Sequence, residues 1–176
     1  WARRWPLLLA TTMSCPPSSS EAAGSPGPFE RLDERVRRWI WEQNWTELRD
    51  IQAAAIEPIL EGTQDIILAA ATASGKTEAA FLPICSQIAG SVADGVHAMY
   101  VSPLKALIND QFGRLELLCA HLEIPVHRWH GDVGAAAKRQ FLEHPRGILL
   151  ITPESLEAMF VIRGPHMAEL FRALRY

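Results

Sequence analysis

The residues with the clearest chemistry form one run of small side chains that ends in a lysine and a threonine. Residues 70–77 read Ala-Ala-Thr-Ala-Ser-Gly-Lys-Thr, which matches the phosphate-binding loop pattern with alanine in the first position. The backbone N–H groups of such a loop surround phosphate oxygens. We therefore expect Lys76 and Thr77 to be catalytic, with the Lys76 ammonium on the β and γ phosphates and the Thr77 hydroxyl on Mg²⁺.

The loop also supplies most of the expected nucleotide-binding residues. Gly75 lets the backbone approach phosphates because it carries no Cβ. The alternative is a strand-to-helix turn of small residues in which Lys76 only faces solvent. The residues that we expect to contact the nucleotide are Thr72, Ala73, Ser74, Gly75, Lys76 and Thr77.

The hydrophobic pattern beyond Gly62 predicts the elements that position this loop. Short apolar runs alternate with longer amphipathic stretches, which is typical of a parallel sheet covered by helices. Strands are expected at residues 66–70, 98–101, 125–129 and 147–151. Helices are expected at residues 77–87, 104–122, 134–142, 155–161 and 166–174. The loop would then connect the first strand to the first of these helices.

The N-terminal part divides into a leader and two helices. Residues 1–28 are expected to be a disordered leader, with Met13 as an alternative start of translation, because Pro, Ser, Gly and Ala dominate residues 14–28. One domain should follow at residues 29–176. Its first helix carries apolar residues at helical spacing from Phe29 to Ile40, and its second follows Trp45 with Thr46 as the candidate N-cap.

Composition limits the choice of compartment and partner. The formal net charge is −3, from 17 basic and 20 acidic residues, so any contact with nucleic acid has to be local. The cysteines are odd in number, without a Cys-x-x-Cys pair, which disfavours a disulfide scaffold and fits the cytoplasm. No apolar run approaches the roughly 20 residues of a membrane-spanning helix. We expect no membrane partner, and the oligomeric state stays open.

Two segments around the loop resemble a known family. Residues 45–52, Trp-Thr-Glu-Leu-Arg-Asp-Ile-Gln, resemble the Q motif of superfamily-two DEAD/DEAH-box helicases, and residues 100–111, Tyr-Val-Ser-Pro-Leu-Lys-Ala-Leu-Ile-Asn-Asp-Gln, resemble motif Ia of the large-helicase-related (Lhr-type) branch. The resemblance covers residues 29–176. It implies an α/β fold, namely a RecA-like P-loop NTPase domain with a parallel sheet flanked by helices, truncated at the C-terminus. It also implies ATP and Mg²⁺ as cofactors.

The same resemblance assigns roles to individual residues. Gln52 matches the glutamine that reads the adenine edge. The partner would be nucleic acid, either DNA or RNA, bound as a single strand. It would contact the segments that follow the expected β-strands at residues 98–101, 125–129 and 147–151. These contacts would come from Pro103, Lys105, Gly131, Thr152 and Pro153. For Lys105 a solvated helix position is the alternative, and for Thr152 and Pro153 a structural helix cap explains the residues equally well.

Two departures from the family pattern matter. Ala73 stands where these helicases often carry glycine, which is acceptable if its φ stays negative. The sequence contains no Asp-Glu-x-His quadruplet, since its Asp-Glu pair, Asp33-Glu34, is followed by Arg-Val and precedes the loop. The parent protein is therefore expected to be an ATP-dependent helicase, while the 176-residue chain should have little ATPase activity.

Two other classes of function remain open. A P-loop kinase or small NTPase would use Lys76 and Thr77 on a soluble acceptor, and it leaves the resembling segments after residue 101 without a role. A non-catalytic nucleotide-binding module would keep only the fold.

Overall fold

The computed structural model describes residues 27–91 and 93–176. The expected leader and Met13 lie outside these residues, apart from residues 27 and 28. The described chain forms one three-stranded parallel sheet in the order β1-β3-β2. Its strands are β1 (Gly95–Val101), β2 (Val126–Trp129) and β3 (Arg146–Ile151). The three strands confirm the predictions for residues 98–101, 125–129 and 147–151.

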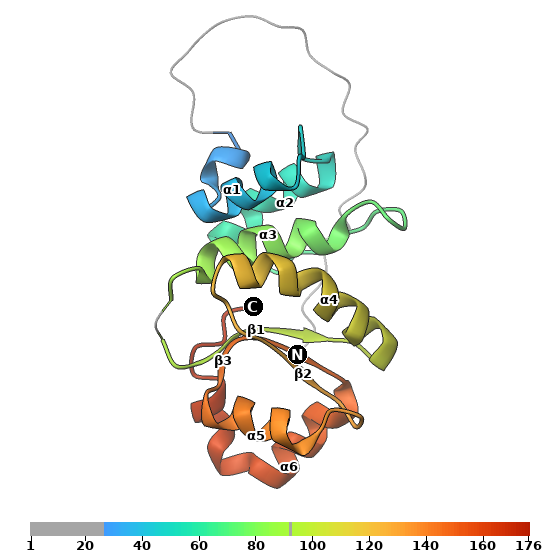
Figure 1. Cartoon of the computed structure of the whole chain (residues 1–176), viewed down its shortest axis with the longest axis vertical. Helices are drawn as coiled ribbons and strands as arrows, with labels where there is room; N and C mark the ends of the chain where they lie inside the picture. The colour runs from blue at the N-terminus through green and yellow to red at the C-terminus, as the bar shows by residue number, and fades with distance from the viewer. Residues whose placement is uncertain (1–26, 92) are drawn as a thin grey trace, which may run out of the picture.

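The central strand β3 is buried on both faces. Ile148 and Leu150 pack toward α3 (Lys76–Ile88) and α4 (Lys105–His121), while Leu149 and Ile151 pack toward α5 (Ala135–Glu143) and α6 (Pro153–Leu170). Figure 1 shows these two helical layers on opposite sides of the sheet. The alternation follows from the period of two in a strand, which sends successive side chains to opposite faces. The α/β architecture predicted from the sequence is therefore confirmed.

Helix α6 corrects one prediction. Two helices were expected at residues 155–161 and 166–174, but α6 runs as one helix from Pro153 to Leu170 with a kink at Arg163, where φ is −123°. Pro165 explains the kink, because its ring clashes with the carbonyl group four residues earlier and it has no N–H to donate.

The strand expected at residues 66–70 is the main error in the sequence-based fold. These residues form no strand in the structure, although Ile66 and Leu68 pack near Tyr176 while Ile67 is 79% exposed. The edge of β1 is taken by the last two residues instead. The N–H of Tyr176 donates to His97 O at 3.3 Å, and the N–H of Met99 donates to Tyr176 O at 2.9 Å. Residues 66–70 thus have the alternation of a strand without a partner strand.

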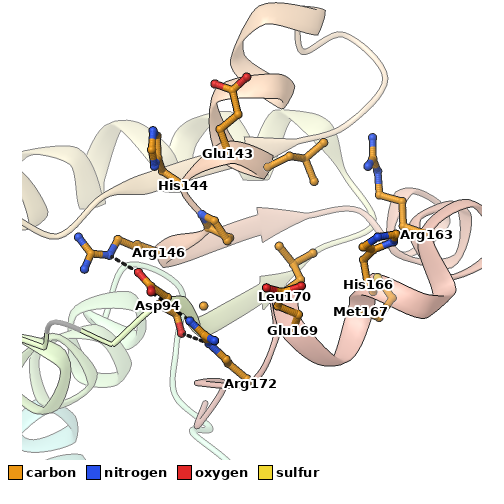
Figure 2. A pocket seen from close by; sticks show the side chains of 13 residues that line it. Asp94, Glu143, His144, Arg146, Arg163, His166, Met167, Glu169, Leu170 and Arg172 are labelled. Carbon is orange, nitrogen blue, oxygen red and sulfur yellow. Dashed lines mark hydrogen bonds and ion pairs between the residues drawn. The ribbon is translucent and has the colours of Figure 1, made fainter.

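The amino edge of the sheet carries an ion-pair network and an open pocket. Asp94, just before β1, lies 3.4 Å from Arg146 Nε and 3.1 Å from Arg172 Nη2 (Figure 2). The pocket of about 630 Å³ beside it is lined by the start of β3 and the C-terminal half of α6. The amino edge is opposite to the carboxyl edge of the sheet. The segments predicted to contact nucleic acid follow the strands at the carboxyl edge.

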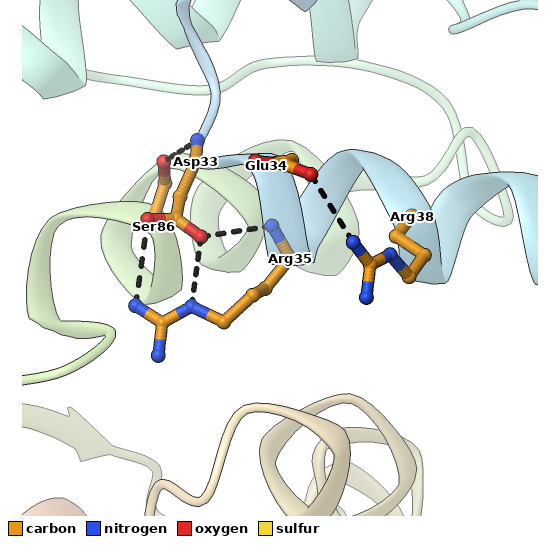
Figure 3. A network of polar contacts seen from close by, with 5 residues as sticks. All are labelled: Asp33, Glu34, Arg35, Arg38 and Ser86. Carbon is orange, nitrogen blue, oxygen red and sulfur yellow. Dashed lines mark hydrogen bonds and ion pairs between the residues drawn. The ribbon is translucent and has the colours of Figure 1, made fainter.

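Helix α1 (Glu34–Glu42) is fixed to α3 by its N-terminal cap. The Asp33 carboxylate accepts from the N–H of Arg35 at 2.9 Å and pairs with its guanidinium at 3.1 Å, while the Asp33 N–H donates to Ser86 Oγ on α3 (Figure 3). The residues of α1 that face the core include Val36 and Ile40. The contacts of Asp33 therefore anchor the start of α1 on α3.

Helix α2 (Asp50–Glu61) begins later than expected. Arg49 occupies its N-cap position, so Thr46 is not the cap that the sequence suggested. Before α1 the chain makes a short 3-10 turn, η1 (Phe29–Arg31).

A glycine at the start of β3 gives a test of this packing. Gly147 has a φ of 74°, and a Cβ there would lie 2.0 Å from the carbonyl oxygen of Pro125. Gly147→Ala should lower the free energy of unfolding by about 2–4 kcal/mol, from backbone strain plus displacement of β2. Urea denaturation measures the change. Gly113→Ala is the control, because nothing lies within 4 Å of its Cβ position inside α4 and alanine should stabilise that helix by about 0.5–1 kcal/mol.

Candidate functional site

The phosphate-binding loop leads directly into α3. Gly75 adopts the left-handed conformation with a φ of 88°, and Lys76 is the first residue of the helix. A Cβ on Gly75 would lie 2.6 Å from Gln52 Nε2, so both the φ and the close neighbour call for glycine. No side chain in the described structure caps this helix, so its first N–H groups can face an anion.

The polar groups of the loop fit a polyphosphate. Lys76 Nζ donates to the carbonyl oxygens of Ala70 and Ala71 at 2.8 and 2.7 Å, which holds the ammonium over the loop. Ser74 Oγ is buried and has no hydrogen-bond partner within the described structure. Thr77 follows in the first turn of α3 and is half-buried. A cation, an unpaired hydroxyl and free amides at one helix start form a site suited to phosphate oxygens.

Ala73 adopts the left-handed conformation, although the sequence pattern was acceptable only with a negative φ at this position. Its φ is +61°, so the condition of a negative φ is not met. An L-residue in this region costs about 1–2 kcal/mol relative to the right-handed conformation. Arg49 Nη1 donates to the carbonyl oxygen of Ala73 at 2.5 Å and stabilises this turn. The sequence pattern did not predict Arg49 as a site residue. The one signal that could have found it is its position within the Q-motif-like segment, residues 45–52.

Gln52 lies beside the loop, as its expected role requires. It is 3% exposed, and its Oε1 accepts from the backbone N–H of Arg49 at 2.9 Å. A pocket of about 460 Å³ opens between the segment of Gln52, the loop, α3 and α4. Its wall includes Trp45, Thr46, Arg49, Gln52, Ala73, Gly75, Glu78 and Arg114. The contact of Gln52 with a base stays a prediction.

The three segments expected to contact nucleic acid leave the sheet at the same level. Val101 of β1 and Trp129 of β2 both pair with Ile151 of β3, so each strand ends beside its neighbour. The structure therefore brings the predicted residues together on the carboxyl edge of the sheet. They are Pro103 and Lys105 after β1, Gly131 after β2, and Thr152 and Pro153 after β3.

Lys105 reaches from the β1 side of this edge to the turn after β2. Its ammonium lies 3.0 and 3.1 Å from the two carboxylate oxygens of Asp132. The Cβ position of Gly131 is 3.4 Å from Lys105 Nζ. The hydrogen bond from Lys105, together with its charge, lowers the pKa of Asp132. Lys105 is thus an exposed residue with a specific carboxylate partner, which the sequence analysis did not foresee.

Thr152 caps α6, as the structural alternative predicted. Its Oγ1 accepts from the N–H of Ser155 at 3.4 Å and donates to Ser155 Oγ at 2.9 Å, and Pro153 takes the first helical position. Thr152 is buried while Pro153 is exposed. The cap is confirmed, and a contact of either residue with phosphate stays a prediction.

A polar network behind this edge was missed by the sequence analysis. Asn109 Oδ1 accepts from Arg128 Nη1 at 2.9 Å and lies 3.3 Å from His130 Nε2, which ties α4 to the end of β2. His130 is 3% exposed, and burial lowers its pKa, which favours the neutral imidazole. His127 lies in β2, and His130 directly follows this strand. The described residues contain no group of three or more His, Cys, Asp and Glu side chains placed to hold a metal ion.

None of the helices formed by residues 27–91 and 93–176 combines the length and apolar character needed to cross a membrane.

Comparison with known proteins shows which family this chain resembles in sequence. Residues 49–176 match the family model described as DEAD/DEAH box helicase. The ATP-dependent helicase Lhr-Core of Methanothermobacter thermautotrophicus is 31% identical over 157 residues, covering 80% of this chain and 18% of the relative. Lhr-Core of Saccharolobus solfataricus is 34% identical over 140 residues, covering 72% and 16%. The chain thus spans less than a fifth of the length of these curated relatives.

Solved structures agree with this similarity. The crystal structure of helicase MrfA superposes with a TM-score of 0.71 at 26% identity, covering 84% of this chain and 23% of the other. The DEAD-box helicase Mss116 bound to ssRNA superposes with a TM-score of 0.72 over 81% of this chain and 30% of the other, and at 22% identity it supports the fold. The predicted RecA-like fold and the resemblance to Lhr-type helicases are both confirmed.

The left-handed conformation of Ala73 can be tested by restoring glycine. Ala73→Gly should raise the free energy of unfolding by up to about 1 kcal/mol, because glycine adopts a φ of +61° without a steric penalty. Urea denaturation provides the measurement. Ala71→Gly is the matched control, since Ala71 has no positive φ and should lose about 0.4–1 kcal/mol through the entropy of the unfolded chain. Equal destabilisation by both changes would contradict the conformation assigned to Ala73.

Proposed function

The chain belongs to the DEAD/DEAH box helicase family, and on that basis we propose that it is the ATP-binding part of an ATP-dependent helicase that moves along nucleic acid. The observation that carries the proposal is that both candidate binding sites lie on the same folded domain. One α/β body holds the phosphate-binding loop at the start of α3 and the three segments at the carboxyl edge of the sheet. Ligands of parallel α/β sheets commonly bind at that edge.

ATP is the nucleotide that we assign to the loop. Lys76 and the free amides of α3 would bind its phosphates, Thr77 would hold Mg²⁺, and the pocket at Gln52 would receive the base. The bound nucleotide supplies the phosphoryl group that is transferred to water. This chain supplies positive charge and hydrogen-bond donors in fixed positions, which is how such loops bind phosphates.

Nucleic acid is the partner that we assign to the carboxyl edge. Lys105 offers a charge, and the start of α4 has no side-chain cap in the described structure, so its amides can also face a phosphate. Contacts of this kind bind the sugar-phosphate backbone and do not depend on base sequence, as movement along a strand requires. In the parent protein, a cycle of ATP binding and hydrolysis would then drive movement along the strand.

A reducing compartment, the cytoplasm, is also part of the proposal. Cys85 and Cys119 are buried free thiols with their sulfur atoms 3.9 Å apart. Two thiols this close would be candidates for a disulfide in an oxidising compartment, where such bonds form and persist.

The two other classes of function explain less of the structure. A kinase or small NTPase acting on a soluble acceptor would bind ATP at Lys76, but it gives no role to the convergence of Pro103, Gly131 and Pro153. A module that keeps only the fold predicts that Lys76 can be changed without consequence for nucleotide binding, and it gives no role to an ammonium held over the loop.

Nucleotide binding is the first test. Lys76→Ala should weaken binding of a non-hydrolysable ATP analogue with Mg²⁺ at least tenfold, because it removes a charge-assisted contact to phosphate. Thr77→Ala should abolish the dependence of binding on Mg²⁺. Isothermal titration calorimetry measures both, and Lys138→Ala on α5 is the control that should bind as the original chain does. Unchanged affinity in Lys76→Ala would support the non-catalytic module.

Turnover is the second test. The sequence contains no Asp-Glu-x-His quadruplet, and phosphoryl transfer needs a held metal and an oriented water in addition to the groups at Lys76 and Thr77. We expect negligible ATP hydrolysis by the 176-residue chain, with or without single-stranded DNA or RNA, although analogue binding persists. A coupled phosphate-release assay makes the measurement. Robust hydrolysis would show that the catalytic groups are already present in this chain.

A further inference from the structure

One carboxylate lies inside a cluster of basic side chains at the carboxyl edge. Lys105, Arg128 and Lys138 all act electrostatically on the His130 ring, and Asp132 is the acidic group that acts on it with them. The remaining basic groups already have partners of other kinds. The Arg128 guanidinium lies 4.2 Å from the centre of the Phe112 ring, and the Lys138 ammonium lies 5.6 Å from that of Trp129.

Asp132 holds its lysine with both oxygens. Lys105 Nζ is 3.0 Å from Oδ1 and 3.1 Å from Oδ2, and the side chains are 49% and 70% exposed. An ion pair this exposed contributes little to folding stability, because water screens it and its side chains lose freedom. A contribution to folding stability therefore does not explain the Lys105–Asp132 pair. The pair is exposed enough for a solute to reach it.

We propose that Asp132 is an internal counter-ion that occupies the phosphate-binding position of Lys105, so that a nucleic-acid phosphate has to displace it. Carboxylate and phosphate oxygens compete for the same donors of an ammonium group. This inference rests on the proposed function of the carboxyl edge and adds a competing anion to it. Displaced from Lys105, Asp132 still lies near Lys138, whose charge also acts on it.

The exchange has a specific thermodynamic signature. A lysine that binds a phosphate of a single strand normally releases about 0.7 of a condensed cation, which makes binding weaker as salt rises. Here Asp132 stays beside the bound phosphate as a negative charge that repels it, and salt screens this repulsion as it screens the attraction of Lys105. The two effects oppose each other, so Lys105 should add little to the salt dependence while Asp132 is present. Removal of the carboxylate should restore the full contribution.

The proposal is tested with five variants of the full chain and a labelled single-stranded oligodeoxythymidine. The variants are Asp132→Asn, Asp132→Ser, Lys105→Gln, the double variant of Asp132→Asn with Lys105→Gln, and Glu169→Gln. Fluorescence anisotropy at several NaCl concentrations gives Kd and its salt slope. Asp132→Asn should bind about two- to fivefold more tightly at low salt, with a slope steeper by about 0.7. In the Lys105→Gln background the same change should have no effect, since the competition no longer exists.

Glu169→Gln makes the same change of charge on α6, beside the pocket at the amino edge of the sheet, and should leave Kd unchanged. If Glu169→Gln tightens oligonucleotide binding as much as Asp132→Asn does, a general effect of net charge explains the result and the counter-ion proposal is wrong. The same holds if Asp132→Asn tightens binding in the Lys105→Gln background. Asp132→Ser, which also removes the carboxylate, should repeat the result of Asp132→Asn, and circular dichroism checks that each variant is folded.

Failure of this inference is distinguishable from failure of the proposed function. If Lys105→Gln weakens binding and Asp132→Asn does not tighten it, the edge binds nucleic acid but Asp132 does not compete. If no variant binds the oligonucleotide even at the lowest salt, the nucleic-acid role of the edge is wrong and the counter-ion is overturned with it.

Discussion

The in-register pairing of β3 with both of its neighbours is the constraint on which the candidate site depends. Hydrogen bonds align Ile151 with Val101 on one side and with Trp129 on the other, so three loops leave the sheet at one level. The four residues Ile148–Ile151 are fully buried, which fixes this register, because a slip by one residue would turn each apolar side chain to the wrong face. Three segments far apart in sequence thereby become one surface.

The cationic side chains of the phosphate-binding loop and of the carboxyl edge are held by oxygen atoms of the protein itself. Arg49 bonds to the carbonyl of Ala73, Lys76 to two carbonyls of its own loop, and Lys105 to Asp132. Each cation thus has oxygen partners of the kind that a phosphate would offer. Because phosphate oxygens must compete with these contacts, the net gain on binding is a difference between two similar interactions. Such a balance favours ligands that bind and leave.

Features of the fold that depend on local pattern could be predicted from the sequence, and those that depend on pairing could not. The three strands of the sheet and helices α3, α4 and α5 follow from apolar periodicity and were placed within a few residues. The loop was found because Gly75, Lys76 and Thr77 are required there by their chemistry. Arg49, Asn109 and Asp132 were missed because their roles arise from partners 24, 19 and 27 residues away. Single polar residues carry no signal for such contacts.

The missing strand at residues 66–70 shows why local pattern is not enough. Its alternation is satisfied, since Ile66 and Leu68 pack among residues such as Ile59 and Tyr176, yet a strand also needs a neighbour that accepts and donates hydrogen bonds. Arg175 and Tyr176 hydrogen-bond to β1 at the edge of the sheet, and within the described residues no backbone hydrogen bond joins residues 66–70 to a strand. Sequence periodicity reports which side chains prefer burial, and it says nothing about whether a backbone partner is in place. The position of the loop therefore depends on α3, which begins at Lys76, and on α2, whose Ala55 and Ile59 pack with Ala79 of α3.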